Sequence, residues 1–498
     1  MKVANGLLLG TAAALMAVSV ARAADLPLKA TPVRYVKICT LYGDGYYYIP
    51  GTDTCVKLGG YIREDVAWNA AGGRTPAYSG TQGAQDRTVS PLSSRARANI
   101  AMDTRTQTPY GTLRTLTSLH FQNQNQTESF NVQRAFIQWA GFTFGRMQSF
   151  SDVFSLNDSW NIEQQQTGSE TGADGVNAIA YTVDLGAGGS LNIGADERRT
   201  KSLANLSTTS TLRVGAEPLD THQGETWPDA YINLRVDQPW GFAGVTGGIH
   251  NVNATYYSGL GAGPFAGTNP CPQPNTTLCG HPNDRVGFFV MAGGELRLPL
   301  LGPADRIGGD VRYSRGASGY GGGTNLASPS LFASGNDLAL GWMSDGVYVN
   351  GSAIELTTAW AVQGGYDHHW SPTWNTTIFA GYANISYDAT AKTYFSGALC
   401  GTGGTGASPQ AAVRFAAGNN CSPNWSYLET GVRTSWTPLP GLTFSAESLY
   451  TYIWSGFNGA GNILASAPGA RPTGVYTFSN QGIWSEYFRV QRNFNTAD

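Results

Sequence analysis

Apolar and polar residues alternate with a period of two along about sixteen segments of this chain, the pattern of strands with one apolar and one polar face. Short turns rich in Gly, Pro or Asp join these segments in pairs, and longer polar loops separate the pairs. The seven turns span residues 103–110, 139–142, 186–189, 237–241, 299–305, 369–374 and 437–441. Seven turns that alternate with eight long loops predict an all-β fold made of hairpins.

The first and last strands have no turn partner in the sequence. They lie near residues 56–69 and 482–494, and they must pair with each other if no sheet edge is to remain. The pattern therefore predicts a transmembrane antiparallel β-barrel over residues 56–494. In a bacterial outer membrane, such a barrel has short periplasmic turns and long extracellular loops.

The N-terminus has the three parts of a secretory signal peptide. Lys2 supplies a positive charge, residues 7–20 form an apolar run of about 14, and Ala21-Arg22-Ala23 is an A-x-A cleavage site. The run is shorter than the ~20 residues of a spanning helix, and no later stretch of ~18 uncharged apolar residues exists. We expect a signal peptide over residues 1–23, an N-terminal segment over 24–55, and a tail over 495–498.

Composition agrees with strands that face lipid on one side and water on the other. The mean hydropathy is -0.21, with 64 Gly, 24 Tyr and 13% charged residues. Without Lys2 and Arg22 the chain has 29 basic and 34 acidic side chains and no basic tract, so nucleic acid is not an expected partner. A soluble β-sandwich that binds sugar would explain the aromatic and glycine content, but not apolar outward faces on strands with arginine inside.

The six cysteines form three pairs that are close in sequence: Cys39 with Cys55, Cys271 with Cys279, and Cys400 with Cys421. Both members of each pair lie in one segment, so we expect three local disulfides that restrict long loops lacking a hydrophobic core. A zinc site is the alternative, but no CxxC motif occurs and His281 is the only histidine near any pair. We expect no metal and no other cofactor.

Strand parity places a group of arginines on one wall of the predicted lumen. In residues 94–102 the alternate alanines, Ile100 and Met102 form the apolar face, so Arg95 and Arg97 face the lumen. The same alternation turns Arg114, His120 and Arg134 inward on the next strands. Together they predict a basic wall. The alternative is that each arginine only pairs with a carboxylate or solvates a polar face.

The third long loop, about residues 151–175, carries charges of one sign. It contains no Lys or Arg, and its acidic residues are Asp152, Asp158, Glu163, Glu170 and Asp174. If the loop folds into the pore, it brings these carboxylates opposite the basic wall and narrows the channel. The alternative is an exposed acidic loop.

No motif supports an enzyme. There is no Gly-x-Ser-x-Gly elbow and no HExxH, and the glycine run 321–323 lacks the Lys and Ser/Thr of a phosphate-binding loop. His368 and His369 are adjacent, so they cannot both face one side of a strand. We expect the six histidines to line the pore or to lie at interfaces.

Three charged residues have outward parity on the first and last strands. They are Glu64, Glu486 and Arg492, and their outward neighbours are apolar. A basic side chain facing lipid costs about 2 to 4 kcal/mol at the midplane and a carboxylate somewhat less. Because both strands meet where the barrel closes, this cluster predicts a subunit interface. The alternative is that all three lie near the headgroups.

Three segments resemble the alphaproteobacterial general porins: residues 39–63 (CTLYGDGYYYIPGTDTCVKLGGYIR), 141–146 (GFTFGR) and 488–494 (FRVQRNF). The resemblance implies a homotrimeric outer-membrane porin of about sixteen strands, constricted by its third loop, that passes small hydrophilic solutes and ions by passive diffusion. It implies a basic wall of Arg95, Arg97, Arg114, Arg134 and Arg146. A channel selective for a sugar or an amino acid is the alternative. Two features depart from the family: a tail follows Phe494, and Arg492 stands where an apolar residue is usual.

Overall fold

The computed structural model describes residues 37–70, 90–156, 159–162, 167–168, 171, 174–199, 201–207, 220–257, 280–324, 326, 328–331, 335–400, 413–415, 420–463 and 472–495. The chain divides into two units, Met1–Ile38 and Cys39–Asp498, and the second contains all the elements below. The predicted signal peptide and residues 496–498 of the predicted tail lie outside the described residues.

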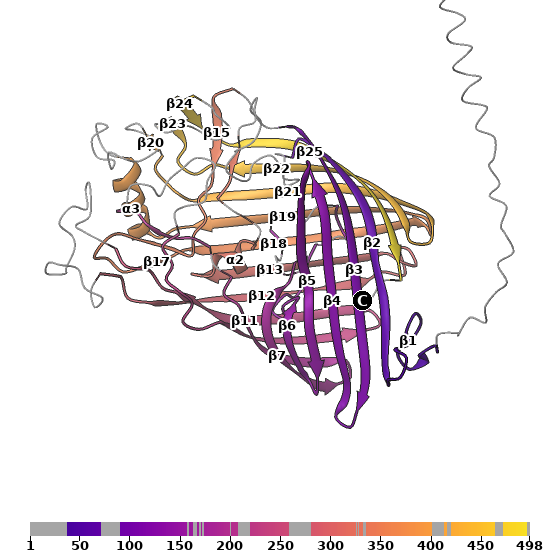
Figure 1. Cartoon of the computed structure of the whole chain (residues 1–498). Coiled ribbons are helices and arrows are strands. Elements are labelled where there is room, and N and C mark those ends of the chain that lie inside the picture. Colours follow the sequence, from indigo (N-terminus) through magenta and orange to yellow (C-terminus); the bar gives the residue numbers. More distant parts are fainter. Residues whose placement is uncertain are drawn as a thin grey trace, which may run out of the picture. The chain divides into compact units, whose positions relative to one another are not determined.

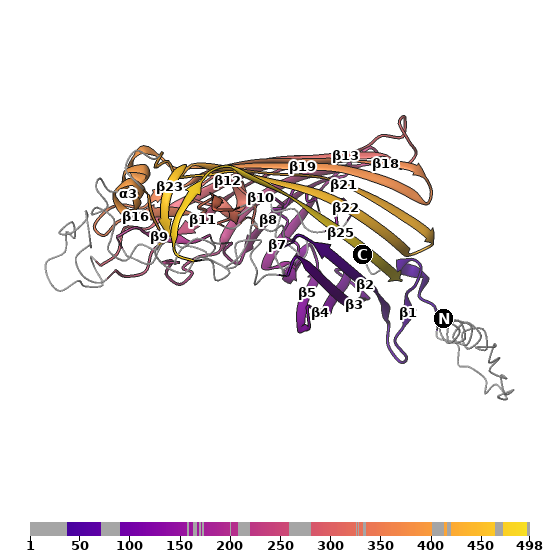
Figure 2. The ribbon, with the colours of Figure 1, turned by 90° about the horizontal axis from the view of Figure 1, so that it is seen from above.

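Long antiparallel strands form one sheet that closes on itself (Figures 1 and 2). Within the described residues the sheet has 17 strands, of which β1 (Tyr47–Tyr48) only extends the start of β2. The barrel strands are β2 (Thr54–Trp68), β3 (Leu92–Thr108), β4 (Gly111–Gln124), β5 (Thr127–Trp139), β6 (Phe142–Met147), β7 (Val176–Gly186), β8 (Gly189–Asp196), β10 (Asp229–Gln238), β11 (Gly241–Val252), β12 (Arg285–Arg297), β13 (Arg306–Arg315), β18 (Thr358–Ser371), β19 (Trp374–Ser386), β21 (Trp425–Leu439), β22 (Leu442–Trp454) and β25 (Gln481–Phe494).

The first and last barrel strands pair with each other, as the absence of a turn partner predicted. β2 and β25 run antiparallel from Gly60↔Phe494 to Trp68↔Glu486. β2 pairs with β3 on its other side, and β25 pairs with β22. The predicted closed antiparallel barrel is therefore confirmed, and no barrel strand has a free edge.

The seven predicted turns all occur, and several are tighter than their sequence signals. The turn predicted over residues 103–110 is only two residues long, because β3 continues to Thr108 and pairs with Gly111. Polar residues remain in the strand there because their side chains bond across it, as in the hydroxyl pair of Thr104 and Thr115. Ala140 and Gly141 form another two-residue turn, both with positive φ (51° and 86°), which suits the twist of the strands they join.

One of the eight connections expected to be long is short. Residues 125 and 126 alone join β4 to β5. Asn125 and Gln126 both have positive φ (48° and 67°), the conformation of a tight hairpin turn. The polar run around them reads like a loop in the sequence, but most of it belongs to the two strands.

Side chains alternate across the wall as predicted. On β3, Ile100 is 51% exposed on the outer face, whereas the neighbouring Asn99 is 5% exposed inside. Asn99 donates to Ser118 on β4 at 2.7 Å. On β3 a period of two thus separates an apolar outer face from a polar inner one.

The outer connections build a layer of their own at one end of the barrel. β14 (Ser330–Leu331), β15 (Asp337–Leu340), β24 (Gly474–Phe478), β23 (Gly459–Ile463) and β20 (Val413–Phe415) form one sheet; β17 (Glu355–Leu356), β16 (Gly346–Tyr348) and β9 (Leu203–Asn205) form another, and helix α3 (Ala389–Leu399) completes the layer. Helix α2 (Ser318–Gly321) instead packs against barrel strands, where Tyr320 stacks on Phe289 of β12. Trp342, Phe395 and Phe457 are at most 2% exposed in its core. The expectation that these loops lack a hydrophobic core is wrong, because loops far apart in sequence combine their apolar residues.

Two of the three predicted disulfides are present in the described residues. Cys39 bonds to Cys55 beside the 3₁₀ turn η1 (Thr40–Tyr42), and Cys400, just after α3, bonds to Cys421. Cys271 and Cys279 lie outside the described residues. No helix among the described residues is long and apolar enough to cross a membrane.

Candidate functional site

The third loop, between β6 and β7, enters the barrel. Phe154, Leu156 and Trp160 are at most 4% exposed, and they pack in one cluster with Phe379 of β19 and Tyr487 of β25. Strands β19 and β25 are far from β6 and β7 in the order of the sheet. The loop therefore crosses the interior, as the sequence predicted.

Glycines on the inner wall make room for this loop. A Cβ added at Gly308 of β13 would lie 2.5 Å from the ring of Phe154, and one at Gly365 of β18 would lie 3.0 Å from Trp160. Any larger residue at Gly308 would push the loop away from this wall and into the lumen. The absence of side chains at these two glycines therefore allows the third loop to lie close to this wall.

Charged side chains of the wall hold the backbone of the loop. Arg433 of β21 donates to the carbonyls of Ser159 (2.7 Å) and Asn161 (3.2 Å). Arg489 of β25 donates to the carbonyl of Ile162 at 2.6 Å, whose amide in turn donates to Glu447 of β22 at 2.5 Å. A buried loop needs partners for its backbone groups, and each bond to a charged group contributes about 1.5 to 3 kcal/mol.

Arg306 of β13 adds a further contact at the same place. Its guanidinium lies 4.2 Å from the ring centre of Trp160 and donates to Ser159 at 3.0 Å. Arg306 also pairs with Glu295 and Asp367, both at 3.3 Å. Arg306, Arg433 and Arg489 together form a clamp on the loop backbone. It could not be predicted from the sequence, because these arginines alternate like any inward polar residue.

Arg199, just after β8, ties down the start of the loop. Its Nη1 lies 3.0 Å from Asp152, and its Nη2 lies 2.7 Å from Asp196 and 2.8 Å from the hydroxyl of Ser151. The carboxyl side chain of Asp152 is only 2% exposed. Among the predicted acidic residues of the constriction, Asp174 is half-buried, and Asp158, Glu163 and Glu170 lie outside the described residues.

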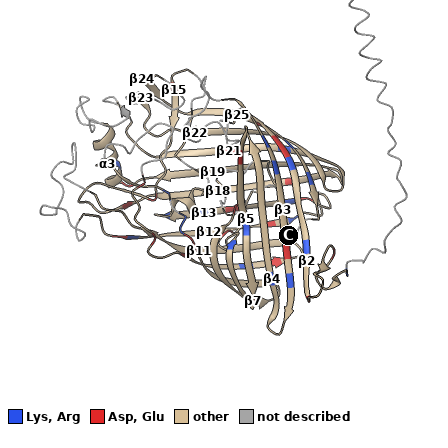
Figure 3. Ribbon diagram, in the orientation of Figure 1, with Lys and Arg blue, Asp and Glu red and all other residues tan. Residues whose placement is uncertain are grey.

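Three arginines of β2, β3 and β25 contact one carboxylate of β2, and Figure 3 marks basic positions in blue and acidic positions in red along the strands. Asp65 is fully buried and contacts Arg95 (2.8 Å), Arg489 (2.6 Å) and Arg63 (3.4 Å). Arg95 thus has a carboxylate partner and still belongs to a basic group.

The other four predicted wall arginines have different surroundings. Arg97 is half-buried and donates to Gln122 at 2.7 Å. Arg114 shares the carboxylate of Asp103 with Arg105, each at 2.9 Å. Arg134 donates to the carbonyl of Gln133 (2.9 Å) and to that of Thr171 in the third loop (3.3 Å), and Arg146 donates to that of Val132 (2.8 Å).

A buried polar network joins the outer loops beside the barrel. His250 lies 2.8 Å from Asp229 through Nδ1 and 3.4 Å from Asp345 through Nε2. Asp345 also accepts from the amides of Ser318 (2.8 Å) and Lys201 (2.7 Å). Burial alone would raise the pKa of Asp345, but these hydrogen bonds and the nearby histidines lower it.

His250 is fully buried, so the expectation that the histidines line the pore or lie at interfaces is wrong for it. The buried position of His250 could not be predicted, because its carboxylate partners come from other segments of the chain. Among the described residues, no three His, Cys, Asp or Glu side chains are placed to hold a metal ion.

His368 and His369 meet one carboxylate at the short-turn end. Asp305 accepts from the hydroxyl of Tyr366 (2.6 Å), from His368 Nδ1 (2.7 Å) and from the backbone amide of His369 (2.9 Å). Burial would raise the pKa of Asp305, but these bonds outweigh it and lower the pKa to about 2. Only the His368 side chain reaches Asp305, while that of His369 lies 3.4 Å from Asp367.

The outward charges near the closure differ in position. Glu64 is exposed in the middle of β2, and Glu486 on β25 accepts a hydrogen bond from Ser448. Arg492 is exposed close to the end of β25 and donates to the carbonyl of Pro440 in a turn. For Arg492 the turn position favours the headgroup region over the middle of the wall.

The comparison with known families agrees with this architecture. The sequence model of the porin subfamily matches residues 25–485. The chain belongs to the porin subfamily. This confirms the family indicated by the three sequence segments, and together with the closed barrel it places the protein in the bacterial outer membrane.

Curated relatives and a solved structure are also similar to this porin-subfamily chain. Porin Omp2b of Brucella suis biovar 1 (strain 1330) is 38% identical over 210 residues, 39% of this chain and 54% of that protein, and Porin Omp2b of Brucella melitensis is 37% identical. The chain spans about half the length of the curated relatives it matches. The outer membrane channel DcaP of Acinetobacter baumannii has the same fold, with a TM-score of 0.55, 13% identity, and coverage of 90% of this chain and 99% of that one.

Proposed function

We propose that the protein is a porin: a water-filled channel through which small hydrophilic solutes and ions diffuse passively across the outer membrane. The observation that carries the proposal is the third loop, which Arg433, Arg489 and Glu447 hold inside a closed barrel. A loop held across the lumen narrows it. Filtration by size and charge follows from this arrangement, and neither catalysis nor a cofactor is needed.

Charge would act on solutes through the two sides of the constriction. Arginines gather around Asp65 on strands β2, β3 and β25, while the sequence of the third loop carries acidic residues and no Lys or Arg. Such a field orients dipolar solutes and disfavours apolar ones, which would displace ordered water. Because acidic groups outnumber basic ones, we expect a weak preference for cations, moderated by the arginines.

Replacing Arg95 and Arg97 together by Ala tests this proposal. Asp65 keeps Arg63 and Arg489 as partners, so the barrel should fold. We expect a larger single-channel conductance and a reversal potential shifted towards cation preference. Arg492→Ala, on the outer face, is the matched control and should change neither. Unchanged conductance and reversal potential in the double variant would contradict a role of this wall in permeation, and conductance that saturates with one sugar or amino acid would favour a selective channel.

We also propose a homotrimer that associates through the closure. Beside outward-facing Glu64, the outer wall has a hollow of about 560 Å³ lined by Ile62, Ala96, Ala98 and Phe121, among others. Ala96 lies directly opposite Glu64 in the β2–β3 register. Small residues permit close approach of a neighbouring barrel, which would remove Glu64 and Glu486 from hydrocarbon.

A further inference from the structure

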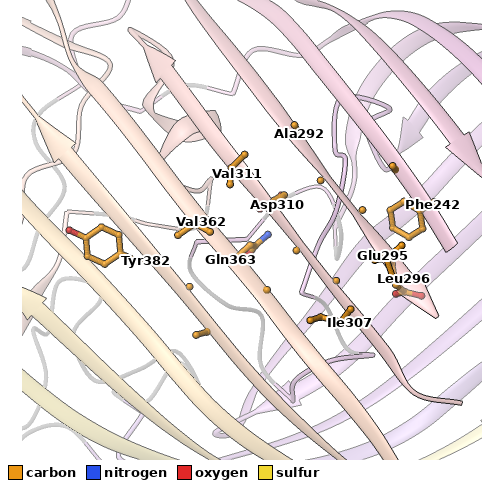
Figure 4. A pocket seen from close by; sticks show the side chains of 18 of the residues that line it. Phe242, Ala292, Glu295, Leu296, Ile307, Asp310, Val311, Val362, Gln363 and Tyr382 are labelled. Carbon is orange, nitrogen blue, oxygen red and sulfur yellow. The ribbon is translucent and has the colours of Figure 1, made fainter. Parts of the chain in front are cut away.

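A second hollow crosses the outer face of the barrel, on the wall formed by β11, β12, β13, β18 and β19 (Figure 4). Its volume is about 840 Å³. Its floor is a row of residues that lie directly opposite one another on five neighbouring strands: Ala243, Gly294, Gly309, Gly364 and Ala380. With strands about 4.8 Å apart, the row extends about 19 Å.

Larger apolar side chains border this floor on both sides. Ile307 and Leu296 (44% and 47% exposed) stand two residues to one side, and Val311 and Val362 (55% and 42%) stand two residues to the other. Since side chains of equal parity share a face, the floor residues between them also face outward. The result is a trough with aliphatic rims and a floor without side chains beyond Cβ.

The backbone keeps this floor bare. A Cβ at Gly294 would lie 2.1 Å from the carbonyl oxygen of Phe242, and one at Gly309 would lie 2.6 Å from that of Gln363. Both distances are too short for a real contact. Neighbouring strands approach too closely here for any residue but glycine.

The trough carries no outward charge. The charged residues that contribute backbone to its lining turn their side chains inward, where Glu295 pairs with Arg306 and Asp310 pairs with Arg312. The outward charges Glu64 and Glu486 lie on a different part of the outer wall, several strands away, where β2 and β25 close the barrel. The two faces therefore suit different neighbours: a protein subunit at the closure, and hydrocarbon here.

The depth of the trough indicates which leaflet supplies that hydrocarbon. Ala243 is two residues from the start of β11, and Gly294 is three residues from the end of β12. At about 3.4 Å per residue, this end lies roughly 7 to 10 Å from the periplasmic ends of the strands, within an apolar band about 25 Å tall. Arg297, exposed at that end and bonded to the Pro239 carbonyl at 3.5 Å, places a positive charge near the headgroup level.

We propose that this trough is a binding site for one acyl chain of a phospholipid in the periplasmic leaflet. Inside a bilayer no hydrophobic gain favours the contact, so van der Waals packing must drive it. An unfilled trough would leave its floor and rims without contacts, and a chain lying obliquely along it restores them. The site is independent of conduction and goes beyond the proposed channel function.

Photolabelling of the full-length protein tests the proposal. The protein is reconstituted in phosphatidylcholine vesicles containing a phosphatidylcholine with a diazirine in one acyl chain, and the labelled residues are mapped by mass spectrometry. We expect labels several-fold enriched at residues 240–244, 292–296, 307–311, 362–366 and 378–382 over the outward residues of β7 and β8, which lie away from the closure. Equal labelling of both regions would overturn the site, as would a crosslinked second copy of the chain on this face.

Variants that fill the trough give the matched comparison. Ala243→Phe with Ala380→Phe should lower the enrichment to the level of the rest of the wall, while Ala195→Phe, on the outward face of β8 two residues from the exposed Ile193, should leave it unchanged. Heat-modifiable gel migration reports whether each barrel is folded, and Ala380→Val is the smaller replacement if the double variant is not. Undiminished enrichment in a folded filled variant would also overturn the proposal.

Discussion

Truncation of Trp160 should release the third loop from the wall. Trp160 is 2% exposed, stacks edge-on with Phe154 at 5.6 Å between ring centres, and lies under Arg306 at 4.2 Å. Replacing a buried aromatic residue by Ala costs about 3 to 5 kcal/mol, which lowers the ratio of docked to released loop about 100- to 4,000-fold. We expect Trp160→Ala to raise single-channel conductance and to add open-channel noise.

The assay is conductance of the purified variant in a planar bilayer, after heat-modifiable migration has shown a folded barrel. Trp370→Ala is the control. Trp370 lies on β18, one of the strands against which the third loop packs, but its side chain is 69% exposed. It should conduct like the parent protein. A folded Trp160→Ala barrel with unchanged conductance and noise would refute the view that this packing defines the constriction.

Three further predictions concern pH, the outer loops and assembly. Because the pKa of Asp305 is lowered to about 2, its ionised form stabilises the fold above about pH 4, and this stabilisation is lost as the pH falls towards 2. The melting temperature of Asp305→Asn should therefore fall less than that of the parent protein between pH 4 and pH 2. An equal fall in both proteins would contradict this role of Asp305. Asp345→Asn breaks the buried network at a cost of about 3 to 5 kcal/mol and should speed trypsin cleavage after Lys201. The control Asp337→Asn should leave the cleavage rate unchanged. Equal cleavage rates in the two variants would contradict a stabilising role of the network. Glu64→Leu with Glu486→Leu should change the dissociation temperature of the trimer, and an unaltered temperature or a monomeric parent protein in mild detergent would exclude the proposed interface.

The barrel could be predicted because its two environments leave a period-two signal in each strand. Ile100 outside and Asn99 inside are an example, and the unpaired first and last strands required closure. The predicted strand boundaries were less accurate where polar residues remain hydrogen-bonded within a strand. Asp103 and Arg105 resemble turn residues in the sequence, yet they pair with each other at 2.9 Å within β3.

The clamp and the outer layer could not be predicted, because their partners are remote in sequence. Arg489 binds the carbonyl of a residue 327 positions away, and its own strand pattern is that of any inward arginine. The hydrophobic core of the outer layer also depends on remote partners, since Trp342, Phe395 and Phe457 come from different loops. Alternation reports which face a side chain takes, but not which loop it meets there.

The most direct test of the porin proposal is the conductance of the purified, refolded protein in a planar bilayer with a salt gradient. The account predicts discrete, long-lived, ohmic conductance steps and a reversal potential of weak cation preference. A folded barrel that inserts without conductance steps would contradict a water-filled channel, and a clear preference for chloride would contradict the assigned balance of charge at the constriction.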